Sequence, residues 1–221
     1  MTAAVLITGC SSGIGHAIAR ACVKAGLPTW ATARKPETIA DLAEAGARVL
    51  ARDVTDETSR RDAIAQVEAE HGAVGALINN AGCAQAGPVE EVPLDALRAQ
   101  FETNVFGLVR LCQLALPGMR ARGSGTIVNL GSAGGLMAFP GSSAYDMIKW
   151  SLEALSDALR AEVRRFGVRV VLLEPGGAPP SRRTPGSTRR TARTPPSPAT
   201  ITSGWRATPR KAPLECPHRT K

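Results

Sequence analysis

The residues best suited to chemistry in this 221-residue chain are a tyrosine and a lysine four positions apart. Tyr145 is the only tyrosine, and Lys149 follows it by about one helical turn, so both side chains would lie on one face of a helix. A phenol has an ordinary pKa of about 10. A neighbouring ammonium stabilises the phenolate and lowers this pKa towards neutral pH, where the group can exchange a proton. The pair is therefore a candidate for general acid–base catalysis. The spacing alone is common, and two ordinary residues on a helix surface would give the same pattern.

Ser132 could complete a catalytic site with this pair. It precedes Tyr145 by thirteen residues and comes just after a largely apolar run at 126–130 that favours a strand. At the carboxyl end of a parallel strand its hydroxyl would face the crevice where such folds bind ligands. There it could donate a hydrogen bond to a substrate oxygen and polarise a carbonyl for hydride attack.

A glycine-rich bend lies near the start of the chain, where Gly9, Gly13 and Gly15 separate an apolar run from a helical pattern. Glycines allow a tight turn and a close approach to a pyrophosphate, and the free N–H groups of the following helix favour an anion. Ser11 and Ser12 add hydroxyl donors. The position of the bend between a strand and a helix predicts dinucleotide binding, with a purely structural turn as the alternative.

The residues at the end of the second expected strand indicate which of the two nicotinamide dinucleotides the chain would bind. NAD-preferring domains place an acid there, but this chain has Arg34 and Lys35, with no acid before Glu37. A guanidinium can bind a 2′-phosphate through two hydrogen bonds, whereas a carboxylate would repel it. We therefore expect NADP(H) in preference to NAD(H), with a solvated basic turn as the alternative.

Short strand patterns alternate with longer helical ones up to about residue 176. The expected strands are 3–8, 29–33, 48–52, 76–79, 125–130 and 169–173, and the expected helices are 14–25, 39–45, 58–71, 94–122 and 144–166. Continuous apolar runs such as 5–7 and 170–173 are typical of strands covered on both faces. The pattern predicts an α/β fold: a Rossmann-like, doubly wound parallel sheet with helices on both faces.

In these motifs, residues 3–177 resemble the classical short-chain dehydrogenase/reductase family. The Gly-x-x-x-Gly-x-Gly spacing is that of the family, and so is the Asn79-Asn80-Ala81-Gly82 motif after the fourth expected strand. Asn104 lies in a long apolar helix, where the family's asparagine kinks the helix and holds a water in a proton relay to the lysine. An asparagine bonded to the backbone within a helix is the plainer alternative.

The resemblance implies a reaction and its residues. Hydride would pass between a nicotinamide and a carbonyl or alcohol carbon, while Tyr145 exchanges the proton, Ser132 fixes the oxygen, and Lys149 and Asn104 tune and reload the tyrosine. Lys149 would also bind the nicotinamide ribose. The implied cofactor contacts come from the bend, the following strand ends, the catalytic pair and the last Pro-Gly turn: Thr8, Gly9, Ser11, Ser12, Gly13, Ile14, Gly15, Arg34, Asp53, Val54, Asn80, Ala81, Gly82, Tyr145, Lys149, Pro175 and Gly176.

The bend and the segment 131–137 are most similar to the hydroxysteroid and retinol dehydrogenase branch, which implies a bulky, apolar ketone or alcohol as the substrate. Fold-level similarity does not fix a substrate. We expect no metal site, because no pair of the five cysteines has the close spacing of a zinc or redox motif. Free thiols, the absence of a secretory signal and the lack of a long apolar run predict a cytoplasmic protein outside the membrane.

The segment 178–221 has a different composition. It holds ten of the 27 Lys and Arg residues, one acidic residue and nine of the 16 prolines, so the excess positive charge lies there. We expect a disordered basic tail produced by a shifted reading frame, following a C-terminally truncated domain at 1–177. Pro180 stands where the family has a threonine that contacts the cofactor, and the substrate lid, the seventh strand and the elements of an oligomer interface are not recognisable.

Two other functions are compatible with the sequence. The chain could be a catalytically impaired nucleotide-binding protein, because the segments that normally close the substrate pocket are missing. It could instead bind nucleic acid through the tail by electrostatic attraction, although Trp205 is the only aromatic residue there.

Overall fold

The fold is built on one six-stranded parallel sheet, and the computed structural model describes residues 3–175. The expectations for Gly176, Pro180 and 178–221 lie outside that range. The strands are β1 Ala4–Ile7, β2 Thr29–Ala33, β3 Arg48–Ala51, β4 Val74–Asn79, β5 Gly125–Leu130 and β6 Val168–Leu173. The helices are α1 Gly13–Lys24, α2 Ala40–Glu44, α3 Glu57–His71, α4 Leu94–Phe101, α5 Gly107–Arg122 and α6 Ser143–Val163.

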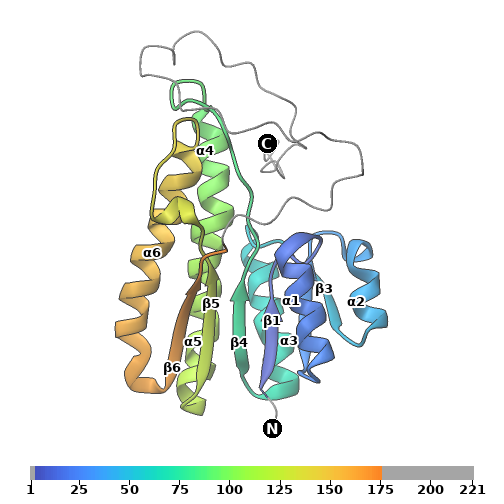
Figure 1. The fold of residues 1–221 in the computed structure, drawn as a ribbon. Coiled ribbons are helices and arrows are strands. Elements are labelled where there is room, and N and C mark those ends of the chain that lie inside the picture. Colours follow the sequence, from blue (N-terminus) through green and yellow to red (C-terminus); the bar gives the residue numbers. More distant parts are fainter. Residues whose placement is uncertain (1–2, 176–221) are drawn as a thin grey trace, which may run out of the picture.

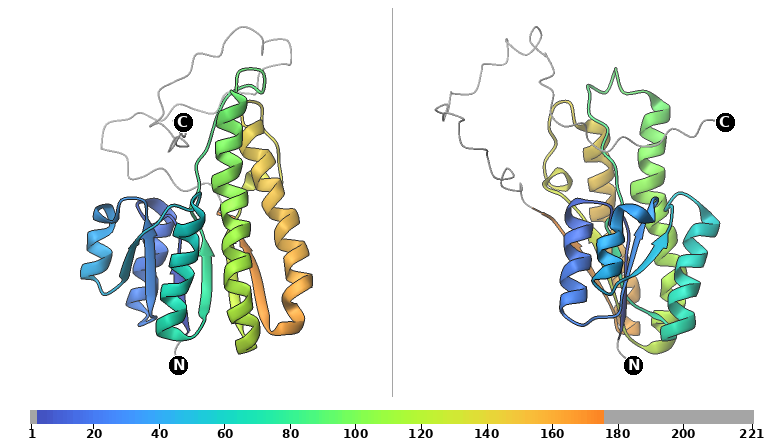
Figure 2. Two further views of the ribbon diagram at one scale, coloured as in Figure 1. Left: turned by 180° about the vertical axis from the view of Figure 1, so that it is seen from behind. Right: turned by 90° about the vertical axis from the view of Figure 1, so that its right-hand side faces the viewer.

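The strand order β3-β2-β1-β4-β5-β6 confirms the expected Rossmann-like sheet (Figure 1). The chain runs outward from β1 to β3, then returns across the sheet and continues outward from β4. This reversal between β1 and β4 leaves a crevice at the carboxyl ends of the strands, which is where open α/β sheets bind ligands. Figure 2 shows α1 and α3 on opposite sides of the sheet.

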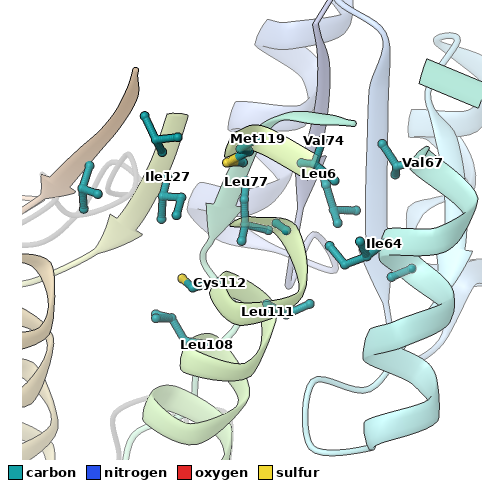
Figure 3. Close-up of a cluster of buried hydrophobic side chains, with 14 of the residues drawn as sticks. Leu6, Ile64, Val67, Val74, Leu77, Leu108, Leu111, Cys112, Met119 and Ile127 are labelled. Atoms are coloured by element: carbon teal, nitrogen blue, oxygen red, sulfur yellow. The ribbon is translucent and has the colours of Figure 1, made fainter. Parts of the chain in front are cut away.

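The larger part of the core lies between the sheet and α3, α5 and α6. Leu6, Leu77 and Ile127, from β1, β4 and β5, are fully buried and pack in one cluster with Leu111 and Met119 of α5 (Figure 3). A second cluster joins the other face of β1 and β2 to α1 and α2. Burial on both faces explains why β1 is apolar without alternation and why every residue of β2, including its two threonines, is buried.

The prediction that β6 is covered on both faces is wrong for the described part of the chain. Val168 and Val170 are buried in the cluster with α6, but Val171 and Leu173, which point to the other face, are each 43% exposed. The apolar run at 170–173 could not reveal this, because apolar residues on both faces do not show which neighbours cover them. β6 is also the edge strand of the sheet among residues 3–175.

A π-helical turn, Glu102–Phe106, interrupts the helix that the sequence predicts over 94–122. It separates α4 from α5 and buries Asn104, which is 6% exposed. Such turns insert one residue into an α-helix and are frequent at functional sites. Within residues 3–175, no helix combines the length and the apolar character needed to cross a bilayer.

A cluster of ion pairs fastens α3 to α5. Glu57 accepts hydrogen bonds from Arg110 at 2.7 Å, from Arg61 at 2.7 Å and from Arg60 at 3.1 Å. The guanidinium of Arg110, followed by those of Arg61 and Arg60, lowers the pKa of Glu57 from 4.5 to about 2. The carboxylate therefore favours the folded state above its ordinary pKa and loses this effect as the pH falls from 4.5 towards 2.

We predict that Glu57→Gln lowers the free energy of unfolding at pH 7, and that its difference from the wild type shrinks between pH 4.5 and 2. Urea unfolding at several pH values measures this. Asp62→Asn, on the exposed side of the same helix, removes one carboxylate as a control. A Glu57 difference that stays constant over this interval would contradict the account.

Candidate active site

The glycine bend connects β1 to α1 at the centre of the crevice. Gly9 and Gly13 have φ values of +71° and +61°, which favour glycine. A Cβ on Gly9 would come within 2.6 Å of Ala81 Cα, whereas a Cβ on Gly13 would meet nothing within 4 Å. The bend is therefore packed tightly against Ala81 at Gly9. At Gly13, the first residue of α1, there is open space that a phosphate group could occupy.

Asn80 fixes this bend to the end of β4. Its side-chain Nδ2 donates to the carbonyls of Thr8 and Gly9, both at 2.9 Å. In return, Thr8 Oγ1 accepts from the backbone N–H groups of Asn80 and Ala81, both at 3.0 Å. Gly15 packs against the Asn80 amide, and any side chain there would overlap it. These contacts hold the two central strand ends together.

A cavity of about 400 Å³ extends from the bend towards the ends of β2 and β3. Gly9, Gly13 and Ile14 line one part, and Arg34 and Asp53 line the part near β2 and β3. The lining offers free helix N–H groups at one end and an arginine at the other, with small residues between them. This chemistry fits an extended dinucleotide with a pyrophosphate on the bend.

A second cavity of about 350 Å³ holds the predicted catalytic residues Ser132, Tyr145 and Lys149. Ile14, Asn80, Gly82 and Cys83 line both cavities, so the two form one groove. The expected bend and the expected Tyr-Lys pair are thus brought together along a single surface.

Ser132 and Tyr145 are both half-buried beside Gly134. The hydroxyl of Ser132 accepts a hydrogen bond from Gly134 N at 3.2 Å. The Ser132 hydroxyl finds no acceptor of its own among residues 3–175, so its hydrogen can be donated towards the cavity. A Cβ on Gly134 would lie 3.3 Å from the ring of Tyr145, so the small residue lets the ring lie close to the loop that carries Ser132.

Lys149 lies under the tyrosine ring. Its Nζ is 5.4 Å from the centroid of the Tyr145 ring and donates to the carbonyl oxygen of Leu130 at 2.7 Å. Burial of the ammonium lowers the pKa of Lys149 from 10.5 to about 8. The amine can therefore change protonation state within a range accessible to enzymes.

Asn104 directs its side chain at backbone groups. Its Nδ2 donates to Gln100 O at 2.8 Å and to Cys83 O at 3.0 Å, and its Oδ1 accepts from Cys83 N at 3.0 Å. The plainer sequence interpretation, an asparagine bonded to the backbone of its own helix, is therefore part of what the structure shows. Asn104 also lines the second cavity and ties the π-helical turn to its wall.

The remaining predicted residues divide by position. Thr8 and Gly15 lie beneath the bend and line neither part of the groove, so their roles there are in shaping it. Gly176 lies outside the described residues. The predicted residues that do line the groove are Gly9, Ser11, Ser12, Gly13, Ile14, Arg34, Asp53, Val54, Asn80, Ala81, Gly82, Asn104, Ser132, Tyr145, Lys149 and Pro175.

Sequence reasoning missed several residues that shape or line the groove, and two of them, Asp146 and Arg52, carry a charge. Asp146 is 4% exposed, accepts from Phe139 N at 2.9 Å and from Ser142 Oγ at 2.6 Å, and so fixes the loop before α6. An acid next to the tyrosine gives no sign of this inward orientation. Arg52 lines the cavity beside Arg34. Its place just before Asp53, at the end of the third strand, was a signal that could have been used.

The family model for short chain dehydrogenases matches residues 3–187. The chain belongs to this family. The match confirms the resemblance inferred from the motifs, and it continues past the expected boundary at 177.

Individual relatives support the same assignment. The chain is 39% identical over 181 residues to oxidoreductase BOA17 of Botryotinia fuckeliana, covering 80% of this chain and 66% of that protein. It is 37% identical over 180 residues to the NADPH-dependent 3-dehydrocapnine reductase of Ornithobacterium rhinotracheale, covering 77% of this chain and 64% of that protein. The matched part spans between 62% and 66% of the length of the first curated relatives.

Two solved structures share the fold, and the first of them is a short-chain dehydrogenase. One from Streptomyces avermitilis is 45% identical with a TM-score of 0.78, covering 80% of this chain and 66% of that one. A gluconate 5-dehydrogenase from Burkholderia cenocepacia, solved with NADP and tartrate, is 31% identical with a TM-score of 0.74, covering 79% and 71%.

The lowered pKa of Lys149 predicts a pH-dependent stability. Because the unfolded chain binds the proton more tightly, the folded wild type gains stability as the pH rises from 8 to 10.5. Lys149→Met has no amine to titrate. Its free energy of unfolding should therefore fall relative to that of the wild type as the pH rises from 8 to 10.5, by at most about 3 kcal/mol. Urea unfolding at pH 7 and pH 10 measures the difference. Lys24→Met, at an exposed lysine of α1, is the control, and an equal Lys149 difference at both pH values would refute the assignment.

Proposed function

We propose that this short-chain dehydrogenase is an NADP(H)-dependent oxidoreductase that interconverts a carbonyl and an alcohol, with Tyr145 as the general acid and base. The observation that carries the proposal is the single groove from the glycine bend to Ser132, Tyr145 and Lys149. The shared lining would place the reactive end of a bound dinucleotide next to the group that transfers the proton.

The two ends of the first cavity support the choice of cofactor. The N-terminus of α1 has no side-chain cap, which leaves its N–H groups free for a pyrophosphate. Arg34 lines the other end, where it would bind a 2′-phosphate, and Asp53 and Val54 lie where the adenine would be placed. The NADPH dependence named for the 3-dehydrocapnine reductase is consistent with this choice. When bound, the nicotinamide supplies or accepts the hydride.

The chain's own residues would then position the substrate and move the proton. Ser132 donates to the substrate oxygen, and the Tyr145 hydroxyl gives a proton to that oxygen or takes it away. Lys149 shares the wall with Tyr145 and offers an amine with a pKa of about 8 near the phenol. Asn104 holds the neighbouring loop through Cys83 and would keep this part of the groove open to a relaying water.

The loop after β5 supports a bulky, apolar substrate. Leu136, Met137 and Phe139 follow Ser132 closely and are 60%, 53% and 50% exposed. Large apolar side chains exposed together beside a polar site favour an apolar ligand. Segment 131–142 contains no charged residue, so nothing in this loop would select a phosphate or carboxylate on the substrate.

The proposal predicts NADPH oxidation by ketones, with a rate that depends on the phenol. Tyr145→Phe removes only the hydroxyl, and we expect the turnover rate to fall by roughly 10²- to 10⁴-fold while NADPH binding is retained. A series of ketones of increasing alkyl length, followed by the absorbance of NADPH, measures the activity. Equal rates for the wild type and Tyr145→Phe would remove the assigned acid. NADPH binding without turnover of any ketone would favour the rival function, a catalytically impaired nucleotide-binding protein.

A further inference from the structure

Arg52 emerges from the sheet directly beside Arg34. β2 and β3 are parallel with Ala33 opposite Ala51, so the two arginines are the next residues on neighbouring strands. Arg52 N donates to Ala33 O at 2.9 Å, which continues the pairing of the two chains by one step. Both arginines line the same cavity, at the end that lies away from Tyr145.

The guanidinium of Arg52 lacks an acidic partner within residues 3–175. Its Nη1 donates to Ala51 O at 2.8 Å, and its Nε is buried without a hydrogen-bond partner among these residues. The nearest acid in sequence, Asp53, is engaged elsewhere, because its Oδ1 accepts from Thr55 N at 2.9 Å and from Thr55 Oγ1 at 2.8 Å.

Other arginines close to this part of the fold are compensated. Arg60 lies 3.1 Å from Glu57 and 3.8 Å from Glu102, and Arg110 lies 2.7 Å from Glu57. A half-buried guanidinium with a buried, unsatisfied N–H has a desolvation cost that an anionic ligand would offset. Arg60 also has a buried Nε without a hydrogen-bond partner in the described part of the chain, so the contrast lies in the acids. Arg60 has two acidic partners and Arg52 has none there, which favours an anionic ligand for Arg52.

We propose that Arg52 and Arg34 together bind the 2′-phosphate of NADP(H), so that Arg52 is a second determinant of cofactor preference. This inference rests on the proposed function. The pyrophosphate is expected at the glycine bend, at the first turn of α1, whereas the two arginines stand at the ends of β2 and β3. Two guanidinium groups at the ends of adjacent strands can bind one dianion from two directions, and Arg52 would do so through its Nη groups because its Nε is buried.

The test compares the binding of NADPH and NADH, and of adenosine 2′,5′-bisphosphate and AMP, by isothermal titration. Arg52→Met keeps an apolar stem and removes the charge. We expect its Kd for NADPH and for the bisphosphate to rise by about tenfold or more, with less than about a twofold change for NADH and AMP. Arg34→Met should behave alike. Lys24→Met, at the far end of α1, controls for the change in net charge and should alter neither.

The outcomes separate the inference from the function on which it rests. If the wild type prefers NADPH and Arg52→Met binds both cofactors as the wild type does, the role of Arg52 is refuted while the function stands. An equal loss for NADPH and NADH would also refute it, since that result places Arg52 against the adenine or in the fold. If the folded wild type binds neither cofactor, the proposed function itself fails. Should Arg52→Met not fold, Arg52→Lys must weaken only the 2′-phosphorylated ligands.

Discussion

The hydrogen bonds between Asn80 and the Thr8–Gly9 bend are the constraint on which the rest of the site depends. A doubly wound sheet must separate its two halves at β1 and β4, and nothing in the strand pairing fixes the loops beyond that point. The amide of Asn80 donates to both carbonyls of the bend, and the Thr8 hydroxyl accepts from the opposite turn. With all of these backbone groups satisfied, the crevice has a defined shape before any ligand enters.

A network of buried polar side chains extends this order towards the part of the groove that holds Tyr145 and Lys149. Asn79 Nδ2 donates to Asn129 Oδ1 at 3.0 Å, and Asn129 Nδ2 donates to Ser156 Oγ at 2.9 Å. The network crosses from β4 to β5 to α6, the helix that carries Tyr145 and Lys149. Because Asn129 and Ser156 are fully buried, each bond that is lost would leave an unsatisfied polar group in the core. The register of α6 on the sheet, and with it the position of Tyr145, is thus coupled to β4, the strand that Asn80 directly follows.

Much of the fold and most of the groove could be predicted from sequence because the signals were local. Strand and helix periods, glycines at a strand-to-helix turn, and a Tyr-Lys spacing each act within a few residues. Three features could not be predicted in this way. The exposure of Val171 depends on which elements cover β6, the π-helical turn at Asn104 depends on contacts with Cys83, and the inward turn of Asp146 depends on Phe139 and Ser142. The first two are set by elements distant in the sequence. The contacts of Asp146 are local, at seven and four residues, but they depend on a loop conformation that the residue types alone do not show.

Titration of the purified chain with NADPH and with NADH tests most directly whether one groove accepts NADP(H) along its whole length. Circular dichroism first establishes that the chain is folded. The account predicts saturable binding of one NADPH per chain, tighter than NADH by about tenfold or more, which corresponds to about 1.4 kcal/mol. A folded chain that binds neither cofactor, or that prefers NADH, would contradict it.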